Sequence, residues 1–419
     1  EISLGLVGSE MCIRDRGNPN FRLLWCSSVL CMTPRVMEST ILAWLVLELT
    51  NSPLQVSYVG ALNWAPLLLL GFIGGTLADS FNRKNVFVAT IVFNLLTAII
   101  MTIVLVMNWI EVWHTFILAF ITGSSHSLGM ASRRSLMHDL VGNESITNAV
   151  ALDNLGNNTS RIVGPGIAGI LIIYGGVKVG YIGICILFVV AVLTSIKIKT
   201  THNTDHNLIE TNLFKNVTDG LKYVKGQTTL LATVLIACVM NLTITPYVQM
   251  TPVMARDVLK VPPDLMGFLL SSHGIGALIG SLVVASVVIH YHGRIYILGS
   301  SLALICLFVF SLSETYLFSL IIVLILGIGN AGFNTMQMSL TMLIPRNSKR
   351  GASLGAMSLG IGMGPIGMVL TGIVANAIGI ANALRINSIV GIICLGLITL
   401  LVPSLKQNFT ANFVNKNDN

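Results

Sequence analysis

The sequence predicts an all-α integral membrane protein with twelve transmembrane helices in two pseudo-symmetric six-helix bundles. Of its 419 residues, 54% are hydrophobic and only 10% are charged, against about 25% charged in soluble proteins. Twelve apolar segments follow one another along the chain, and lysine and arginine are concentrated in alternate loops. This composition excludes a soluble enzyme, a disordered chain and a nucleic-acid-binding domain. The expected surroundings are a lipid bilayer.

The apolar segments have the length expected of membrane-spanning helices, about 20 residues. They do not alternate apolar with polar residues, as strands of a membrane β-barrel would. The segments are 22–47, 55–78, 86–107, 112–132, 146–174, 177–197, 228–250, 265–289, 294–312, 316–344, 351–378 and 384–405.

Lysine and arginine set the expected orientation, because cytoplasmic loops carry an excess of both. The two chain ends and the even-numbered loops hold 18 of the 24, and the odd-numbered loops hold four. The remaining two, Arg35 and Arg161, lie inside apolar segments. We therefore expect a multi-pass protein of a prokaryotic inner membrane with both termini in the cytoplasm.

The longest polar stretch divides the chain into two halves of six segments each. Leu213–Gly226 within it has apolar residues at helical spacing among lysines, which indicates either a basic amphipathic helix on the membrane surface or an ordinary solvated linker.

Glu1–Arg16 resembles translated sequencing-adapter sequence and is expected to be non-native. The expected divisions are 1–16, an N-terminal bundle at 17–198, a cytoplasmic linker at 199–227, a C-terminal bundle at 228–405 and a polar tail at 406–419.

The two halves share glycine–proline pairs at equivalent places. Gly164 and Pro165 lie in the fifth segment, and Gly364 and Pro365 lie in the eleventh. Proline removes a backbone hydrogen bond and glycine permits close approach, so each pair is a candidate helix bend. Paired halves with helices interrupted in this way are typical of transporters that rock around a central site; a simple packing kink is the alternative.

One loop carries the most specific motif. Residues 75–84 read GTLADSFNRK, which resembles the GxLaDrxGrk signature (motif A) of the major facilitator superfamily. Ser80 stands where that signature has a basic residue, and Asn82 stands where it has glycine. Asparagine tolerates a left-handed backbone, so we expect the turn to be retained.

Further stretches resemble one branch of that superfamily, the enterobactin-exporter-like and macrolide-efflux-like transporters. They are NFRLLW at 20–25, WLVLELTNSP at 44–53, SRRSL at 132–136, DLV at 139–141, NAVAL at 148–152 and RIVGP at 161–165. The resemblance extends over about 18–405. It implies two six-helix bundles that alternate in access, and it links the glycine–proline pair of the fifth segment to the antiporter motif C.

The resemblance also implies a conformational latch at the cytoplasmic face. Its residues would be Gly75, Asp79, Arg83, Lys84, Arg133 and Arg134. The Asp79 carboxylate would meet the positive N-terminal end of a helix near 348–351 when the inner face is shut. A role in membrane insertion alone is the alternative for these charges.

Ionisable groups inside the apolar segments are the candidates for chemistry, because each costs about 2.5–3.5 kcal/mol at membrane depth. Arg35 and Glu38 lie three residues apart in the first segment. They either form a structural ion pair, or Glu38 takes up a proton during transport while Arg35 tunes the pKa of Glu38 or meets an anionic substrate. Asp153, Asn157 and Arg161 form a stripe in the fifth segment. This stripe either handles substrate and protons or packs helices together.

Other side chains are weaker candidates. His126 and His273 could carry protons or join helices by hydrogen bonds. Large side chains that could line a cavity or pack the core are Trp44, Trp64, Tyr247, Phe333, Met336 and Met338. The seven cysteines include no CxxC pair, and we interpret them as small hydrophobic residues.

Together these features predict a secondary active transporter that exports a small amphipathic molecule of the drug or siderophore class by proton antiport. No nucleotide-binding loop, metal motif or catalytic carboxylate pair is present, so no cofactor, metal or catalytic residue is expected. An uptake facilitator or symporter of the same fold is the main alternative. A membrane receptor and an intramembrane enzyme are the alternatives from other classes.

Overall fold

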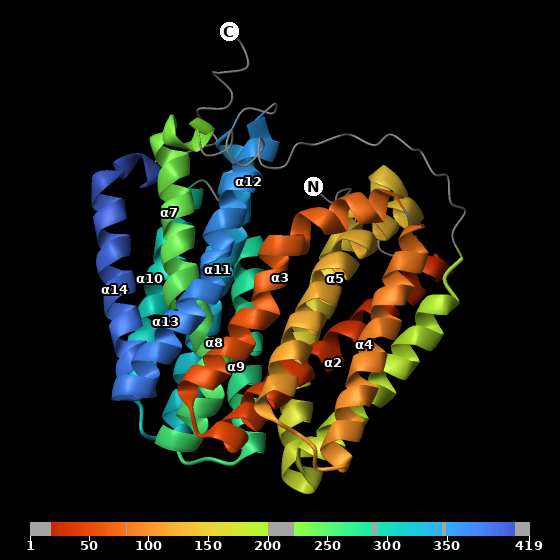
Figure 1. Ribbon diagram of the computed structural model, residues 1–419. Coiled ribbons are helices and arrows are strands. Elements are labelled where there is room, and N and C mark those ends of the chain that lie inside the picture. The colour runs from red at the N-terminus through yellow and green to blue at the C-terminus, as the bar shows by residue number, and fades with distance from the viewer. Residues whose placement is uncertain (1–17, 81, 200–221, 287–290, 346–348, 407–419) are drawn as a thin grey trace. The chain divides into compact units, whose positions relative to one another are not determined.

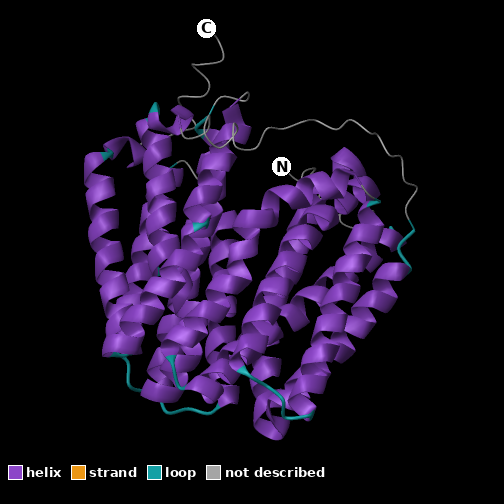
Figure 2. Ribbon diagram, in the orientation of Figure 1, coloured by secondary structure: helices purple, strands orange, loops and turns teal. Residues whose placement is uncertain are grey.

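The structure is a computed structural model that describes residues 18–80, 82–199, 222–286, 291–345 and 349–406. For 68–80, 143, 144 and 147 it describes the backbone only. Within these ranges the chain consists of helices and connecting turns, without a strand (Figures 1 and 2). The segment at 1–16, most of the expected linker and the tail beyond 406 lie outside the described residues.

The first half of the chain contains four helical stretches, of which the last consists of three helices joined at two glycines. Residue Gly142 in that helix has a φ of 69°, and Gly176 has a φ of 71°. Glycine adopts such left-handed values without the steric penalty of a Cβ, so the chain turns at both points and the helix has three legs, 112–141, 143–175 and 177–196 (Figure 1). The helices are α2 Pro19–Thr50, α3 Pro53–Ser80, α4 Arg83–Val106 and α5 Val112–Ile196.

The second half contains shorter helices, several of which run on from one another. Two stretches, Thr228–Val258 and Arg350–Ile378, each form one apolar span from more than one helix. The elements are α7 Thr228–Thr243, α8 Thr245–Val253, the π-helical turn η1 Met254–Val258, α9 Pro263–Ser286, α10 His292–Ser311, α11 Tyr316–Leu343, α12 Arg350–Ile361, α13 Met363–Ile378, α14 Ile380–Leu401 and η3 Pro403–Lys406.

The helices fit a multi-pass membrane protein. By length and composition, nine stretches of the described residues can cross a bilayer. One of them, Asn148–Ile196, includes the turn at Gly176 and therefore holds two legs. With α3 and the first leg of α5 included, the described helices give the twelve spans that the sequence predicts.

Contacts group the chain into two compact units. Unit 1 comprises 1–45 and 62–209, and unit 2 comprises 46–61 and 210–419. The hairpin at 46–61, which joins α2 to α3, thus packs with the second half of the chain. The predicted division at the linker did not anticipate this assignment.

Glycines set how closely helices approach in unit 2. A Cβ on Gly276 of α9 would lie 1.9 Å from the carbonyl oxygen of Leu324 in α11. In return, a Cβ on Gly327 of α11 would lie 2.3 Å from the carbonyl oxygen of His273 in α9. Small residues drive such contacts in membranes, where lipid removes the hydrophobic driving force between helices.

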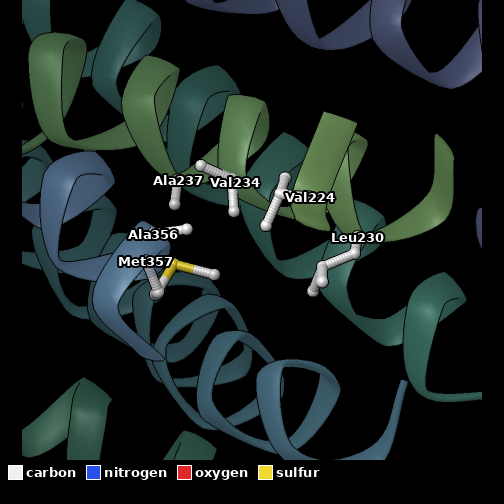
Figure 3. Packing of buried hydrophobic residues seen from close by; sticks show 6 residues of the cluster. All are labelled: Val224, Leu230, Val234, Ala237, Ala356 and Met357. Carbon is white, nitrogen blue, oxygen red and sulfur yellow. The ribbon is translucent and has the colours of Figure 1, made fainter. Parts of the chain in front are cut away.

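The end of the linker is packed against unit 2. Residues 222–225 are helical, and Val224 is buried in a cluster with residues of α7 and α12 (Figure 3). The cluster consists of Val224, Leu230, Val234, Ala237, Ala356 and Met357. The part of the predicted amphipathic helix before residue 222 lies outside the described residues, so its placement on the membrane stays a prediction.

Candidate functional site

The first ionisable group of the candidate site is a carboxyl group in the middle of α2. Glu38 is only 3% exposed, and its Oε1 has no hydrogen-bond partner among the described residues. Arg35 Nη2 donates instead to Asn63 Oδ1, at 3.4 Å. The described contacts contain no ion pair between Arg35 and Glu38, although the two residues lie three positions apart on α2.

Asn63 of α3 connects this guanidinium to α5. Its Nδ2 donates to the carbonyl oxygen of Ala119 at 3.3 Å and to Thr122 Oγ1 at 3.2 Å. The helices approach closely here, because a Cβ on Gly123 would lie 2.1 Å from the Asn63 carbonyl oxygen. Sequence reasoning did not single out Asn63. The available signal was an amide within the apolar segment 55–78.

The stripe predicted in the fifth segment lies on the second leg of α5 and divides into two parts. Asp153 forms an ion pair with Arg133 of the first leg, with side chains 16% and 8% exposed respectively. Asn157 Nδ2 donates to Asp153 Oδ2 at 3.1 Å. Arg161 is exposed and has no hydrogen-bond or ion-pair partner among the described residues. A small pocket lies beside the Arg133–Asp153 pair, against Phe21, Leu24 and Trp25 of α2.

The two glycine–proline pairs differ in structure. Helix α5 passes through Gly164 and Pro165 with helical dihedral angles, and a Cβ on Gly164 would lie 3.1 Å from Val36 Cβ of α2. The second pair lies in the first turn of α13, directly after α12 ends at Ile361. Proline is tolerated in a first turn, whose N–H groups have no partner within the helix. The first pair thus packs closely on α2 and the second starts a helix, and a role of either pair as a bend stays a prediction.

The predicted latch residues are only partly described. Arg83 pairs with Asp139 of α5 at 2.5 Å, and Lys84 Nζ donates to the Ile196 carbonyl oxygen at 2.9 Å. The side chains of Gly75 and Asp79 lie outside the described residues. Arg134 is exposed near Arg133. The latch itself therefore stays a prediction.

Within motif A, the structure does not use the left-handed tolerance of asparagine. Asn82 has a φ of −57° and is not left-handed. Its side chain accepts hydrogen bonds from the backbone N–H groups of Lys84 and Asn85, at 3.1 and 3.3 Å. Asn82 therefore caps α4, as asparagine commonly does at a helix start.

The candidate histidines lie in different units. His126 in unit 1 interacts electrostatically with Arg35, Arg133, Arg134 and Arg161. His273 Nε2 lies 3.4 Å from Asn330 Nδ2, which links α9 to α11 in unit 2. The cavity candidates Trp44, Tyr247, Phe333 and Met336 are buried in packing, while Trp64 and Met338 are exposed.

A second polar cluster, which we call the hairpin clasp, holds the hairpin 46–61 to the rest of unit 2. Arg256 Nη1 donates to the Leu47 carbonyl oxygen and to Asn51 Oδ1, each at 2.9 Å. Gln249 Nε2 donates to the Val56 carbonyl oxygen at 3.3 Å. Close packing reinforces these bonds, because a Cβ on Gly372 would lie 2.1 Å from Ser57 Oγ. Sequence reasoning placed none of these residues in a site.

The chemistry available is that of binding and proton transfer. Among the described residues, no group of three or more His, Cys, Asp or Glu side chains could hold a metal ion. The charged groups that we singled out within spans, Arg35, Glu38, Asp153 and Arg161, belong to unit 1 and come from α2 and α5. They are suited to hold a charged solute or to exchange a proton.

Comparison with known proteins gives a family and relatives over nearly the whole chain. The model of a family described as "transmembrane secretion effector" (MFS_3) matches residues 16–417. The MFS-type transporter YfiS of Bacillus subtilis is 24% identical, over 86% of this chain and 87% of its own. The multidrug efflux pump Tap of Mycolicibacterium fortuitum is 24% identical (87% and 91%), and the staphyloferrin A transporter of Staphylococcus aureus is 25% identical (83% and 87%).

Solved structures share the fold at lower sequence identity. The nucleoside transporter NupG matches with a TM-score of 0.74 at 12% identity, over 91% of this chain and 99% of its own. An inward-facing bacterial homologue of the human lysosomal transporter Spinster matches with a TM-score of 0.71 at 12% identity, over 94% and 98%. These likenesses establish the architecture and leave the transported solute open.

Proposed function

Because the chain belongs to the transmembrane secretion effector family of major facilitator transporters, we propose that it exports a small amphipathic molecule of the drug or siderophore class. Two relatives support this proposal: one is named a multidrug efflux pump and another a staphyloferrin A transporter. The chain is thus a multi-pass membrane transporter and not an enzyme. The outward direction of transport and the class of substrate are what we propose.

The observation that carries the proposal is Glu38, buried in the middle of α2 without a partner for Oε1. A structural carboxylate at membrane depth would be expected to bind a cation or several donors, since its charge costs about 2.5–3.5 kcal/mol there. A carboxyl group that must take up and release a proton in each cycle is better left unbound. We propose that Glu38 carries the coupling proton, with Asp153 as the second candidate.

Proton antiport is the mode of coupling that we propose. Protons entering the cell down their gradient would protonate Glu38 from outside and leave it inside, while substrate moves outward. The uptake alternative uses the same groups with substrate and proton moving together. The direction of substrate movement under a proton gradient separates the two.

Location and orientation form part of the proposal. The concentration of lysine and arginine in alternate loops supports a bacterial inner membrane with both termini in the cytoplasm. Reporter fusions after Lys215 and after Lys406 should both show a cytoplasmic signal. A periplasmic signal at either position would break the twelve-span orientation.

The export proposal is tested with purified protein in liposomes. A panel of fluorescent amphipathic dyes is offered in the presence of an imposed pH gradient, with empty liposomes as the control. We expect at least one dye to move against its own gradient and towards the acidic side. Movement of a dye away from the acidic side, in the same direction as the proton, would instead establish symport. If no dye moves with the pH gradient imposed in either direction, the export proposal is rejected for this class of substrate.

A further inference from the structure

Three basic side chains of unit 1 lie at the same depth, in the middle of their helices. Arg35 is 16 residues after the start of α2 and 15 before its end. Arg161 is 19 residues after Gly142 and 15 before Gly176, the turns that bound the second leg of α5. His126 is 14 residues after the start of α5 and 16 before Gly142. Transporter substrates commonly bind at this depth.

Two contacts show that Arg35 and Arg161 occupy adjacent positions on packed helices. Thr33 Oγ1 donates to Ser160 Oγ at 3.1 Å, and Gly164 packs against Val36. These contacts join α2 to α5 immediately beside the two arginines.

The positive charge at this level is incompletely compensated. Arg133 is paired with Asp153, and Glu38 lies one helical turn from Arg35. Arg161 has no carboxylate partner among the described residues. Its side chain is exposed and can be reached by another molecule. A guanidinium in mid-membrane is about 15 Å from the headgroups on either side, which is too far for its side chain to reach them. An arginine at this depth commonly marks the path or binding site of a substrate.

Three helices of unit 2 carry no competing charge. Between residues 265 and 286, 295 and 311, and 316 and 343, the helices α9, α10 and α11 contain no Asp, Glu, Lys or Arg. Arg385 of α14 lies five residues after the start of its helix, away from the helix middle. The arginines near the middle of their described helices, Arg35 and Arg161, both belong to unit 1.

We infer that Arg161, assisted by Arg35, binds a carboxylate group of the transported molecule, which makes the substrate an amphipathic organic anion. Guanidinium has a planar, two-pronged donor geometry that matches a carboxylate. The exposed indole of Trp64, adjacent to Asn63, supplies an aromatic surface on the same unit for the apolar part. This inference rests on the proposed function, because it assigns a chemical class to the exported molecule.

The test compares rhodamine B, which carries a free carboxylate, with its ethyl ester, which does not. Fluorescence anisotropy measures binding of each dye to the full-length protein in lipid nanodiscs. We expect wild-type protein to bind rhodamine B about tenfold more tightly than the ester. Arg161→Gln should remove that preference, Arg161→Lys should retain part of it, and Arg22→Gln, at an exposed arginine near the start of α2, should leave it unchanged.

Thermal unfolding separates recognition from structure. Because no described side chain pairs with Arg161, Arg161→Gln should leave the unfolding midpoint unchanged, whereas a structural role predicts a fall. The inference is overturned if no Arg161-dependent preference for the free carboxylate is found, including the case in which neither dye binds. Transport in liposomes is scored separately. Export of the ester without dependence on Arg161 would support the export proposal and reject the anion site. Arg161-dependent binding without any gradient-driven movement would support the anion site and reject the export proposal.

Discussion

Glu38 and Asp153 are both acidic and both lie inside spans, but their surroundings give them different chemistry. Glu38 has an oxygen without a partner, so replacing it by glutamine breaks no described hydrogen bond. Asp153 is bound by Arg133 and Asn157. A carboxyl group engaged in this way must lose two partners before it can take up a proton. The structure therefore favours Glu38 over Asp153 as the proton carrier.

The first prediction concerns coupling at Glu38. Glu38→Gln should lower pH-driven transport at least about tenfold, equivalent to about 1.4 kcal/mol in the barrier, because the side chain can no longer exchange a proton. Transport is measured in liposomes with an imposed pH gradient, and the thermal midpoint should be unchanged. Glu314→Gln, at an exposed loop position, is the control. Undiminished pH-driven transport in Glu38→Gln would eliminate this role.

The second prediction concerns the pair between Arg133 and Asp153. Asp153→Asn should lower stability by about 1–3 kcal/mol, since it leaves a mostly buried guanidinium without its anion. Removing both charges in Arg133→Gln/Asp153→Asn should cost less than this single change. Thermal unfolding in detergent measures both variants. No loss of stability in Asp153→Asn would show that the pair is energetically unimportant.

Sequence reasoning identified the charged residues of the site but not most of their partners. Arg35, Glu38, Asp153 and Arg161 were found because charges are rare in apolar segments. An ion pair with Glu38 was one of two alternatives for Arg35, and the hydrogen bond described for its guanidinium goes to Asn63. Spacing along one helix can propose an ion pair, but only packing between helices decides which neighbour is within reach.

At the scale of the helices, hydrophobic length predicted the spans and glycine conformation determined how they connect. Three predicted segments are legs of the single helix α5 because turns at Gly142 and Gly176 replace loops. Helix α9 approaches α11 closely at Gly276. Which helix lies opposite could not be derived from one sequence, because small residues indicate a contact without naming its partner.

The third prediction tests this packing. Gly276→Ala should lower the free energy of unfolding by about 1–3 kcal/mol, because its Cβ would overlap the Leu324 carbonyl oxygen, a backbone atom that cannot rotate away. Gly396→Ala is the matched control in α14, where nothing lies within 4 Å of the added atom. Thermal unfolding in the same detergent compares them. If Gly276→Ala is as stable as Gly396→Ala, the approach of α9 and α11 is looser than described.

At the scale of the whole molecule, the notable finding is that the hairpin 46–61 packs with the second half of the chain. The alternation of lysine and arginine predicts this hairpin to be periplasmic. An alternating-access cycle would then require the hairpin to separate from its partners when the outer face opens. The composition of the loops predicted which side of the membrane the hairpin occupies, but not that Arg256 would bind it.

The fourth prediction follows from the hairpin clasp. Arg256→Ala removes two hydrogen bonds to the hairpin. We take their combined contribution as about 1.5 kcal/mol, the lower end of the range for a charged donor, because solvent reaches the Arg256 side chain, which is 26% exposed. That free energy shifts a two-state equilibrium about tenfold towards separation of the hairpin. A cysteine at Leu54, which packs against Gly372, should react faster with an impermeant maleimide. Arg256→Lys is the control that keeps a cationic donor, and unchanged labelling in Arg256→Ala would show that the clasp does not restrain the hairpin.

The fifth prediction concerns the face that the lysine and arginine distribution predicts to be cytoplasmic, where Asp79 is the acidic residue of motif A. If its carboxylate meets the N-terminal end of α12, the contact contributes about 0.3–1 kcal/mol when exposed and up to about 2 when partly buried. Asp79→Asn should then favour the inward-open state by roughly 2- to 30-fold and slow cycling. A cysteine at Ala352, in the first turn of α12, should label faster from the cytoplasmic side.

Loss of the clasp should favour opening of the outer face, and loss of the latch should favour opening of the inner face. Arg256→Ala should therefore partly restore the wild-type rate in an Asp79→Asn background. Labelling that stays the same or falls in Asp79→Asn alone would leave Asp79 with a role in membrane insertion or local loop structure only.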